Sequence, residues 1–337
     1  MKRAYELIFQ VNKMLDEEIL DAVQQLEFID DLQRLCLSYH FEDKIKHILN
    51  RIYLEHKYNC KNYEMDLYST ALEFRLLRQH GFRVSQDVFD CFKNDKGDFK
   101  SSHGEDTKGL LQLYEASFLL TQGEKTLELA KEFASNFLKK KLEDDEGNIG
   151  NNIHDEHLSS LWRVPRVNAR WCIDEYEKRQ DMKPIVLELA KLDFNIVQAT
   201  NQQELKHLSR WWKQTSLVEM LPFARDRLVE CYLWTVGGLL FEPQNGHARI
   251  MVAKVNALIT VIDYVFDVYG TLEELQAFNN AIQRWDIEAM DKLPNYMQIC
   301  FLALNNFIDE VAYHVLREQG FLIILHLRKS VTLLTPY

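Results

Sequence analysis

The chain has 337 residues, of which only 12 are Gly and 6 are Pro. Because proteins on average contain roughly 7% Gly and 5% Pro, this shortage of turn residues argues against a β-sandwich or β-barrel and predicts an all-α protein. Hydrophobic residues make up 47% of the chain, enough for large cores in two domains. The net charge of −11 excludes a broad basic surface, so we expect no nucleic-acid partner.

Amphipathic helices separated by short polar breaks follow one another from Leu7 to about Arg179. One helix carries apolar residues between Leu67 and Leu77 and ends at Gly81, and Ser85 stands where the N-cap of the next helix belongs. This rhythm is typical of antiparallel helix pairs around a shared core. The acidic, Gly- and Asn-rich segment from Glu143 to Asn152 predicts an exposed loop.

A charge-rich run that ends at Pro184 separates this first part from the rest of the chain. We therefore predict two domains, residues 1–180 and residues 181–337. Between Leu217 and Tyr269 the helices are apolar nearly all round, which predicts that they are buried at the centre of a bundle.

Two more helices are predicted towards the end of the chain. Thr271 and Glu274 form a capping box that starts one helix, and the other runs from about Tyr296 to Gln319 and closes at Gly320. The segment from Phe321 to Leu327 is again apolar, and we expect residues 331–337 to offer no partner element that would cover it. We therefore expect that the chain is cut short.

The cysteines and the uncharged stretches bear on the compartment. The six cysteines are scattered and show no close pairs, which is typical of reduced thiols inside an intracellular protein. The longest uncharged stretches, Cys231 to Phe241 and Ile299 to Ile308, are shorter than the ~20 residues that a helix needs to cross a bilayer. With no signal- or transit-peptide pattern at the N-terminus, we expect a soluble, cytoplasmic chain without a membrane span.

Asp263 and Asp267 lie four residues apart in an otherwise apolar stretch. On a helix, this spacing places both carboxylates on one face with their Cβ atoms roughly 5–6 Å apart. Two such carboxylates repel each other unless a cation lies between them, and Mg²⁺ binds through one or two carboxylates together with water and phosphate oxygens. The alternative is an ordinary acidic pair on the solvated side of a helix.

Arg225, Arg227 and Trp234 precede this pair along the chain. A pair of arginines that faces a metal site would hold a diphosphate, because the guanidinium group matches phosphate geometry. The alternative is a surface pair tied to Asp226 and Glu230. Trp234 could stabilise a carbocation through the face of its ring, or it could simply pack in the core.

The chain resembles plant terpene synthases of the class I type, in particular the monoterpene synthase branch of flowering plants. The resemblance extends in order through nearly the whole chain as far as Ser330. It rests on the segments Leu26–Asp30, Leu37–Glu42, Ala71–Phe82, Glu105–Leu110, Leu189–Asn195, Arg225–Arg227 and Val268–Thr271.

The resemblance implies an N-terminal α/α-barrel-like domain followed by a class I terpenoid synthase α-bundle, which is incomplete here. It implies a lyase that uses Mg²⁺ or Mn²⁺ to ionise a prenyl diphosphate, foremost geranyl diphosphate, and gives a terpene. Asp263 and Asp267 would be the metal ligands and catalytic residues. Arg225 and Arg227 would receive the diphosphate, with Trp234 as a wall of the pocket. We also expect a monomer, and a plastid location if the N-terminus is incomplete.

The sequence departs from the family pattern in three respects. Tyr264 stands where the metal motif has a second acid beside Asp263, so weaker metal binding is expected. The N-terminal tandem-arginine motif is absent, and the second metal motif would lie beyond Tyr337. A catalytically inactive, truncated remnant is therefore the alternative to an active enzyme.

Overall fold

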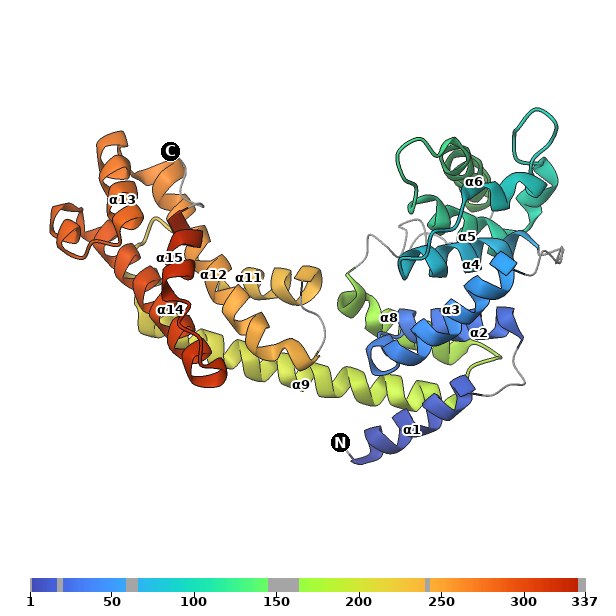
Figure 1. The fold of residues 1–337 in the computed structure, drawn as a ribbon, viewed down its shortest axis with the longest axis horizontal. Coiled ribbons are helices and arrows are strands. Elements are labelled where there is room, and N and C mark those ends of the chain that lie inside the picture. Colours follow the sequence, from blue (N-terminus) through green and yellow to red (C-terminus); the bar gives the residue numbers. More distant parts are fainter. Residues whose placement is uncertain (1, 17–20, 59–65, 145–163, 240–242, 333–337) are drawn as a thin grey trace. The chain divides into compact units, whose positions relative to one another are not determined.

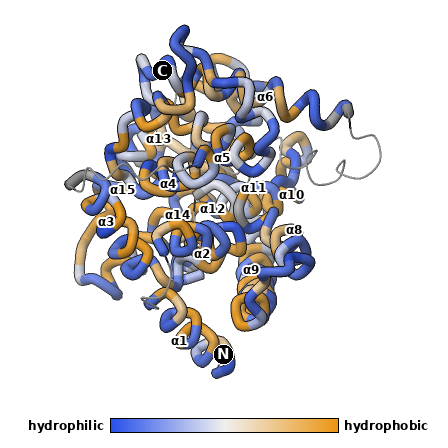
Figure 2. The backbone as a smooth tube through the Cα atoms, turned by 90° about the vertical axis from the view of Figure 1, so that its right-hand side faces the viewer, coloured by the Kyte–Doolittle hydropathy of each residue, from blue (hydrophilic) through white to orange (hydrophobic). Residues whose placement is uncertain are grey.

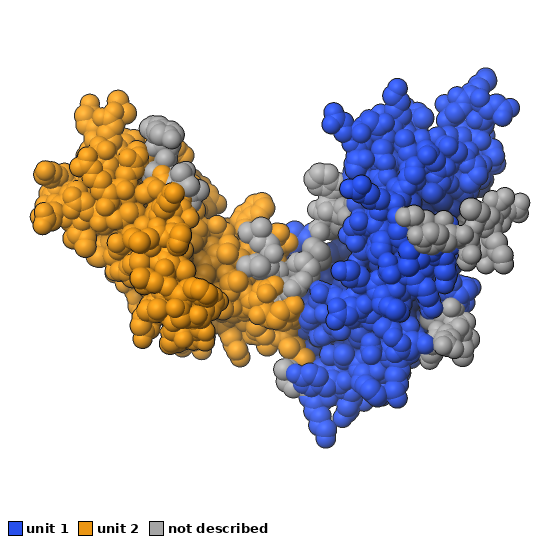
Figure 3. Space-filling view, viewed as in Figure 1, with its two compact units in different colours: residues 1–195 blue, residues 196–337 orange. Residues whose placement is uncertain are grey.

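The computed structural model describes residues 2–16, 21–58, 66–144, 164–239 and 243–332 (Figure 1). These residues form helices joined by turns and loops, and their β-structure is limited to an isolated antiparallel bridge between Lys93 and Phe99. The all-α prediction is therefore confirmed. The chain divides into two compact units, residues 1–195 and residues 196–337, which Figure 3 colours separately.

In unit 1, helices that are neighbours in the chain pack against each other, as the repeated amphipathic segments predict. Its main helices are α1 (Lys2–Asp16), α2 (Ala22–Arg34), α3 (Glu42–Tyr58), α4 (Leu67–Gln79), α5 (Thr107–Ser117), α6 (Lys125–Asp144), α8 (Pro165–Lys178) and the first part of α9 (Pro184–Thr215). Shorter helical segments are η1 (Ser38–His40), η2 (Gln86–Phe92) and η3 (Ser101–Glu105). Helices α4, α5 and α6 pack in succession, and α2 packs against α4. The predicted loop from Glu143 onward falls outside the described residues after Asp144.

Side-chain caps fix where several of these helices begin. Asp21 and Gln24 form a capping box at α2, and Asp66 and Asp106 accept backbone hydrogen bonds at the starts of α4 and α5. Ser85 caps η2, as its position in the sequence predicts. Each cap satisfies a backbone N–H that the helix itself leaves without an acceptor.

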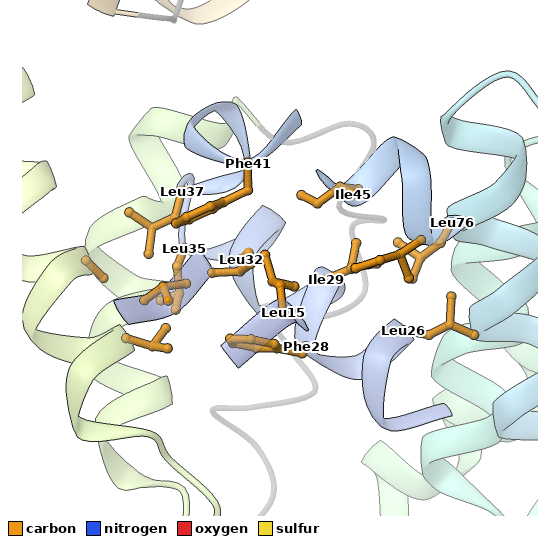
Figure 4. Close-up of a cluster of buried hydrophobic side chains, with 14 of the residues drawn as sticks. Leu15, Leu26, Phe28, Ile29, Leu32, Leu35, Leu37, Phe41, Ile45 and Leu76 are labelled. Atoms are coloured by element: carbon orange, nitrogen blue, oxygen red, sulfur yellow. The ribbon is translucent and has the colours of Figure 1, made fainter. Parts of the chain in front are cut away.

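The described residues of unit 1 form two clusters of buried apolar side chains, and α4, which is buried nearly all round, contributes to both. Figure 4 shows side chains from the first helices of the chain and from α4 pointing towards one another. Phe28, Ile29 and Leu32 of α2 are completely buried there, together with Leu76 of α4. Figure 2 shows hydrophobic and hydrophilic residues alternating along helices such as α6, which is typical of helices with one buried face.

Unit 2 starts within α9 and continues through a second set of helices. They are α10 (Leu217–Met220), α11 (Leu228–Trp234), η5 (Thr235–Leu239), η6 (Pro243–Asn245), α12 (Gly246–Tyr264), η7 (Val265–Tyr269), α13 (Leu272–Arg284), η8 (Glu288–Lys292), α14 (Asn295–Gln319) and α15 (Ile324–Thr332). The segments η5 and η7 are π-helical. The predicted capping box of Thr271 and Glu274 starts α13, and Gly320 closes α14 with a φ of 72°.

The prediction that nothing covers the segment from Phe321 to Leu327 is wrong for Ile324 and Leu327. These two residues belong to α15, a helix that the sequence did not predict, and this helix packs against α13 and α14. Ile324, Leu327 and Val331 contact the core of unit 2. The short apolar run lacked a clear period because only one narrow stripe of α15 is covered. Residues 333–337 lie outside the described part.

Helix α14 is long and apolar enough to cross a membrane when judged by length and composition alone. Its stripe of Met297, Phe301, Leu304 and Ile308 is buried against the other helices of unit 2. Core helices of soluble proteins satisfy the same criterion, so this is weak evidence for a membrane span.

The prediction that the helices of residues 217–269 are buried all round is wrong for part of their surface. Ala257, Leu258 and Val261 of α12 are buried, but Leu233 of α11 and Val268 of η7 are 57% and 74% exposed. The described residues leave these two apolar side chains largely uncovered. The composition of these helices therefore indicates more burial than the described fold provides.

Candidate functional site

Helix α12 carries Asp263, leads directly into the segment that carries Asp267, and is fixed in unit 2 by two ion pairs. Arg249 pairs with Glu204 of α9 at 2.7 Å, and Lys254, whose side chain is buried, lies 2.6 Å from the exposed Glu310 of α14. Figure 1 shows α12 running beside α11 and α14. Because both cationic side chains are desolvated and paired, they hold the helix in a defined position against its neighbours.

Asp263 lies in the last turn of α12, and Asp267 lies in the π-helical segment η7 that follows directly. Both residues are exposed. Partial desolvation of the carboxylate, and then the negative charge of Asp267, raise the pKa of Asp263 above its usual value. The two carboxylates are therefore close enough to repel each other, although the regular α-helix predicted for this stretch changes to a π-helix between them. Such π-helical segments often occur at functional sites.

This pair fits a divalent cation. Neither carboxylate forms a hydrogen bond or an ion pair with the described residues, and their mutual repulsion would be relieved by a positive charge. The described residues contain no group of three or more His, Cys, Asp or Glu side chains arranged to hold a metal ion. A cation here would thus need further oxygen ligands from water or a substrate, as Mg²⁺ commonly takes.

Arg225 and Arg227 lie in the loop that leads into α11. Arg225 is exposed, and Arg227, the N-cap of α11, forms a loose ion pair with Glu230 at 3.7 Å. The other acid considered as a partner, Asp226, accepts hydrogen bonds from the Trp212 indole and from the backbone of Leu228. The arginine side chains are therefore accessible to an anionic ligand.

Trp234 ends α11 and is 73% exposed, so the core-packing alternative for this residue is wrong. Its indole ring is therefore accessible to a ligand. Asp263, Asp267, Arg225, Arg227 and Trp234 thus all belong to unit 2, and all keep at least part of their side chains accessible.

An aromatic cluster that the sequence analysis missed connects the arginine loop to the aspartate segment. Phe223, two residues before Arg225, stacks on Tyr269 at the end of η7, with ring centroids 3.9 Å apart and an interplanar angle of 4°. Tyr296 lies edge-on to both rings and donates a hydrogen bond to Glu274 at 3.0 Å. The sequence did not predict this cluster, because Phe223, Tyr269 and Tyr296 lie far apart in the chain and no local spacing relates them.

Two family models match the chain. The model described as "Terpene synthase, N-terminal domain" matches residues 1–159, and the model described as "Terpene synthase family, metal binding domain" matches residues 213–336. The second match includes all five candidate residues.

The relatives that match this chain are longer than it is. Cineole synthase 1, chloroplastic, from Salvia fruticosa is 59% identical over 332 residues, which are 98% of this chain and 55% of the relative. The crystal structure of a limonene synthase with 2-fluorolinalyl diphosphate is 55% identical with a TM-score of 0.92, covering 98% of this chain and 62% of that one.

A third relative is isoprene synthase from leaves of grey poplar (Populus x canescens), in complex with three Mg²⁺ ions and dimethylallyl-S-thiolodiphosphate. It is 42% identical with a TM-score of 0.92, covering 98% of this chain and 63% of that one. The chain therefore spans 55% to 63% of the lengths of these relatives.

Proposed function

Because the chain belongs to the terpene synthase family, we propose that it ionises a prenyl diphosphate, with geranyl diphosphate as the substrate, to release diphosphate and form a monoterpene. The observation that carries this proposal is the repelling carboxylate pair of Asp263 and Asp267. The names of the relatives support it, because one is a cineole synthase and another is a limonene synthase bound to 2-fluorolinalyl diphosphate.

Each candidate residue has a distinct role in the proposed reaction. Asp263 and Asp267 would hold Mg²⁺ or Mn²⁺, and the isoprene synthase with three Mg²⁺ ions favours Mg²⁺. Bound metal would neutralise the negative charge that develops on the departing diphosphate. Arg225 and Arg227 hold the diphosphate oxygens as the C–O bond breaks, and the bonding electrons leave with the diphosphate. Trp234 offers its ring face to the allylic cation.

The remaining expectations follow from the same proposal. We assign the α/α domain to residues 1–180 and the metal-binding domain to residues 181–337, and we propose that the chain acts as a monomer. The chloroplastic cineole synthase supports a plastid location. Organelle fractionation of source tissue with an antibody against the chain tests that location, and size-exclusion chromatography with light scattering tests the monomer.

Product analysis tests the proposed activity. Purified protein is incubated with geranyl, neryl or farnesyl diphosphate and with Mg²⁺ or Mn²⁺, and the volatile products are identified by gas chromatography and mass spectrometry. We expect a monoterpene from geranyl diphosphate that is lost in Asp263→Asn and kept in Asp291→Asn, a matched exposed aspartate of η8. Absence of any product with folded wild-type protein would support the inactive alternative instead.

A further inference from the structure

Unit 1 contains a cavity of about 720 Å³ that the proposed reaction does not use. Residues of α2, α4, α5 and α8 line it, together with Gln180 and Asp181 in the turn that follows α8. Its size lies within the range of roughly 300–1,000 Å³ that is typical of small-molecule sites. The cavity lies in a different unit from Asp263 and Asp267, so its occupant is a separate question from the activity proposed above.

The lining of this cavity holds more carboxylates than cationic groups. Six carboxylates and three cationic side chains face it. Ion pairs occupy most of them: Arg34 pairs with Asp30 and Glu115, and Arg179 pairs with Asp31 and Asp181. Among the described residues, Glu27 pairs with no cationic group and accepts a hydrogen bond from the hydroxyl of Tyr68 at 2.9 Å. The uncompensated negative charge that faces a ligand therefore lies mainly at Glu27.

Aromatic rings also line the cavity. Tyr68 comes from α4, and Trp171 and Tyr176 come from α8. The guanidinium group of Arg179 lies 5.0 Å from the centre of the Tyr176 ring, so a cation–π contact is already present in this lining. Carboxylates beside aromatic rings are the combination that binds organic ammonium groups, through charge and cation–π attraction.

The raised pKa of Asp31 also favours a positively charged ligand. Burial raises its pKa to about 6, even though Arg179 pairs with it and acts in the opposite direction. The ionised carboxylate is therefore insufficiently compensated by the protein itself. A cation in the cavity would relieve that cost, whereas an anion would increase it.

We propose that this cavity binds an organic cation, namely a primary ammonium compound whose apolar body lies against Trp171 and whose charge faces Glu27 and Asp31. An anionic ligand such as a phosphate is disfavoured, because Arg34 and Arg179 would have to leave their carboxylate partners to bind it, and Lys108 is a single positive charge among six carboxylates.

A matched series of three probes tests this proposal on the full chain by isothermal titration calorimetry. Benzylammonium, benzyl alcohol and benzoate share one ring and differ in charge. We expect benzylammonium to bind at least tenfold more tightly than either of the others at pH 7.5. Equal affinity of the three probes, tighter binding of benzoate, or no binding of benzylammonium to the folded protein would overturn the proposal.

Cysteine protection localises the bound probe. Cys172 lines the cavity and is partly exposed, whereas the exposed Cys91 does not line it. Benzylammonium should slow maleimide labelling of Cys172, followed by peptide mass spectrometry, without affecting Cys91. Glu27→Gln should weaken binding about tenfold, and Glu132→Gln, the same change at an exposed position of α6, should not. Slower labelling of both cysteines, or an equal response of the two variants, would contradict this site.

Discussion

At the scale of single residues, Asp263 has a carboxylate whose ionised form is disfavoured until a cation arrives. Desolvation and the charge of Asp267 raise its pKa, so protons compete with metal at a higher pH than for an ordinary aspartate. Metal affinity should therefore fall as the pH drops through this raised pKa. In the metal-free protein, the folded state should gain stability as Asp263 becomes protonated, because a raised carboxyl pKa penalises the charged form.

Replacing the neighbouring charge tests this coupling. Asp267→Asn removes the negative charge that acts on Asp263, so the pKa of Asp263 should decrease towards its value of 3.8 in a model compound. Titration of ¹³C-labelled aspartate carboxyl groups by NMR in the absence of metal measures it. Asp291→Asn should leave the titration unchanged. An Asp263 pKa that is the same in Asp267→Asn and in the wild type would show that the two carboxylates do not interact.

Tyr269 connects the two halves of the proposed site through its stacking on Phe223. Such ring pairs contribute about 0.5–1.5 kcal/mol, so Tyr269→Ala should raise the KM for the diphosphate substrate roughly three- to tenfold by loosening the arginine loop. Tyr269→Phe should retain the wild-type KM, because the stack needs only the ring. Steady-state kinetics measure both, and Tyr313→Ala on α14 serves as an exposed control. A wild-type KM in Tyr269→Ala would show that Tyr269 does not position the arginine loop.

At the scale of elements, Gly270 determines how η7 ends. Its N–H donates to the carbonyl of Val265 at 2.8 Å, and an added Cβ would lie 2.9 Å from that backbone oxygen and 2.7 Å from Leu275. Gly270→Ala should therefore displace the segment that carries Asp267, costing about 1–3 kcal/mol of stability and weakening metal binding. Thermal unfolding and metal titration measure the two effects. Gly238→Ala in η5, where a Cβ meets nothing within 4 Å, should be nearly neutral.

Element boundaries show what sequence reasoning captured and what it missed. Caps are local, so Ser85, Thr271 and Gly320 could be placed from the sequence alone. The stacking of Phe223 on Tyr269 could not, because the two rings come from segments that are distant in the chain. The π-helical turn at Asp267 was not predicted either. Helix α15 was missed because only one narrow stripe of it is covered.

At the scale of the whole molecule, the two units have separate cores. Phe28 is buried among the helices of unit 1, and Phe278 is buried in the core of unit 2. Truncation of a buried Phe to Ala typically costs about 3–5 kcal/mol. Phe28→Ala should therefore lower the unfolding temperature of one calorimetric transition, and Phe278→Ala that of another. A single transition that both variants lower equally would mean that the shared helix α9 makes the units unfold together.

The most direct test of the account is the rate of diphosphate release from geranyl diphosphate as a function of Mg²⁺ concentration. It compares the wild type with Asp267→Asn and Asp291→Asn, after circular dichroism has shown that all three are folded. The account predicts Mg²⁺-dependent release by the wild type and by Asp291→Asn, and a rate at least tenfold lower in Asp267→Asn. Equal rates in all three proteins, or no release by the wild type at any Mg²⁺ concentration, would contradict it.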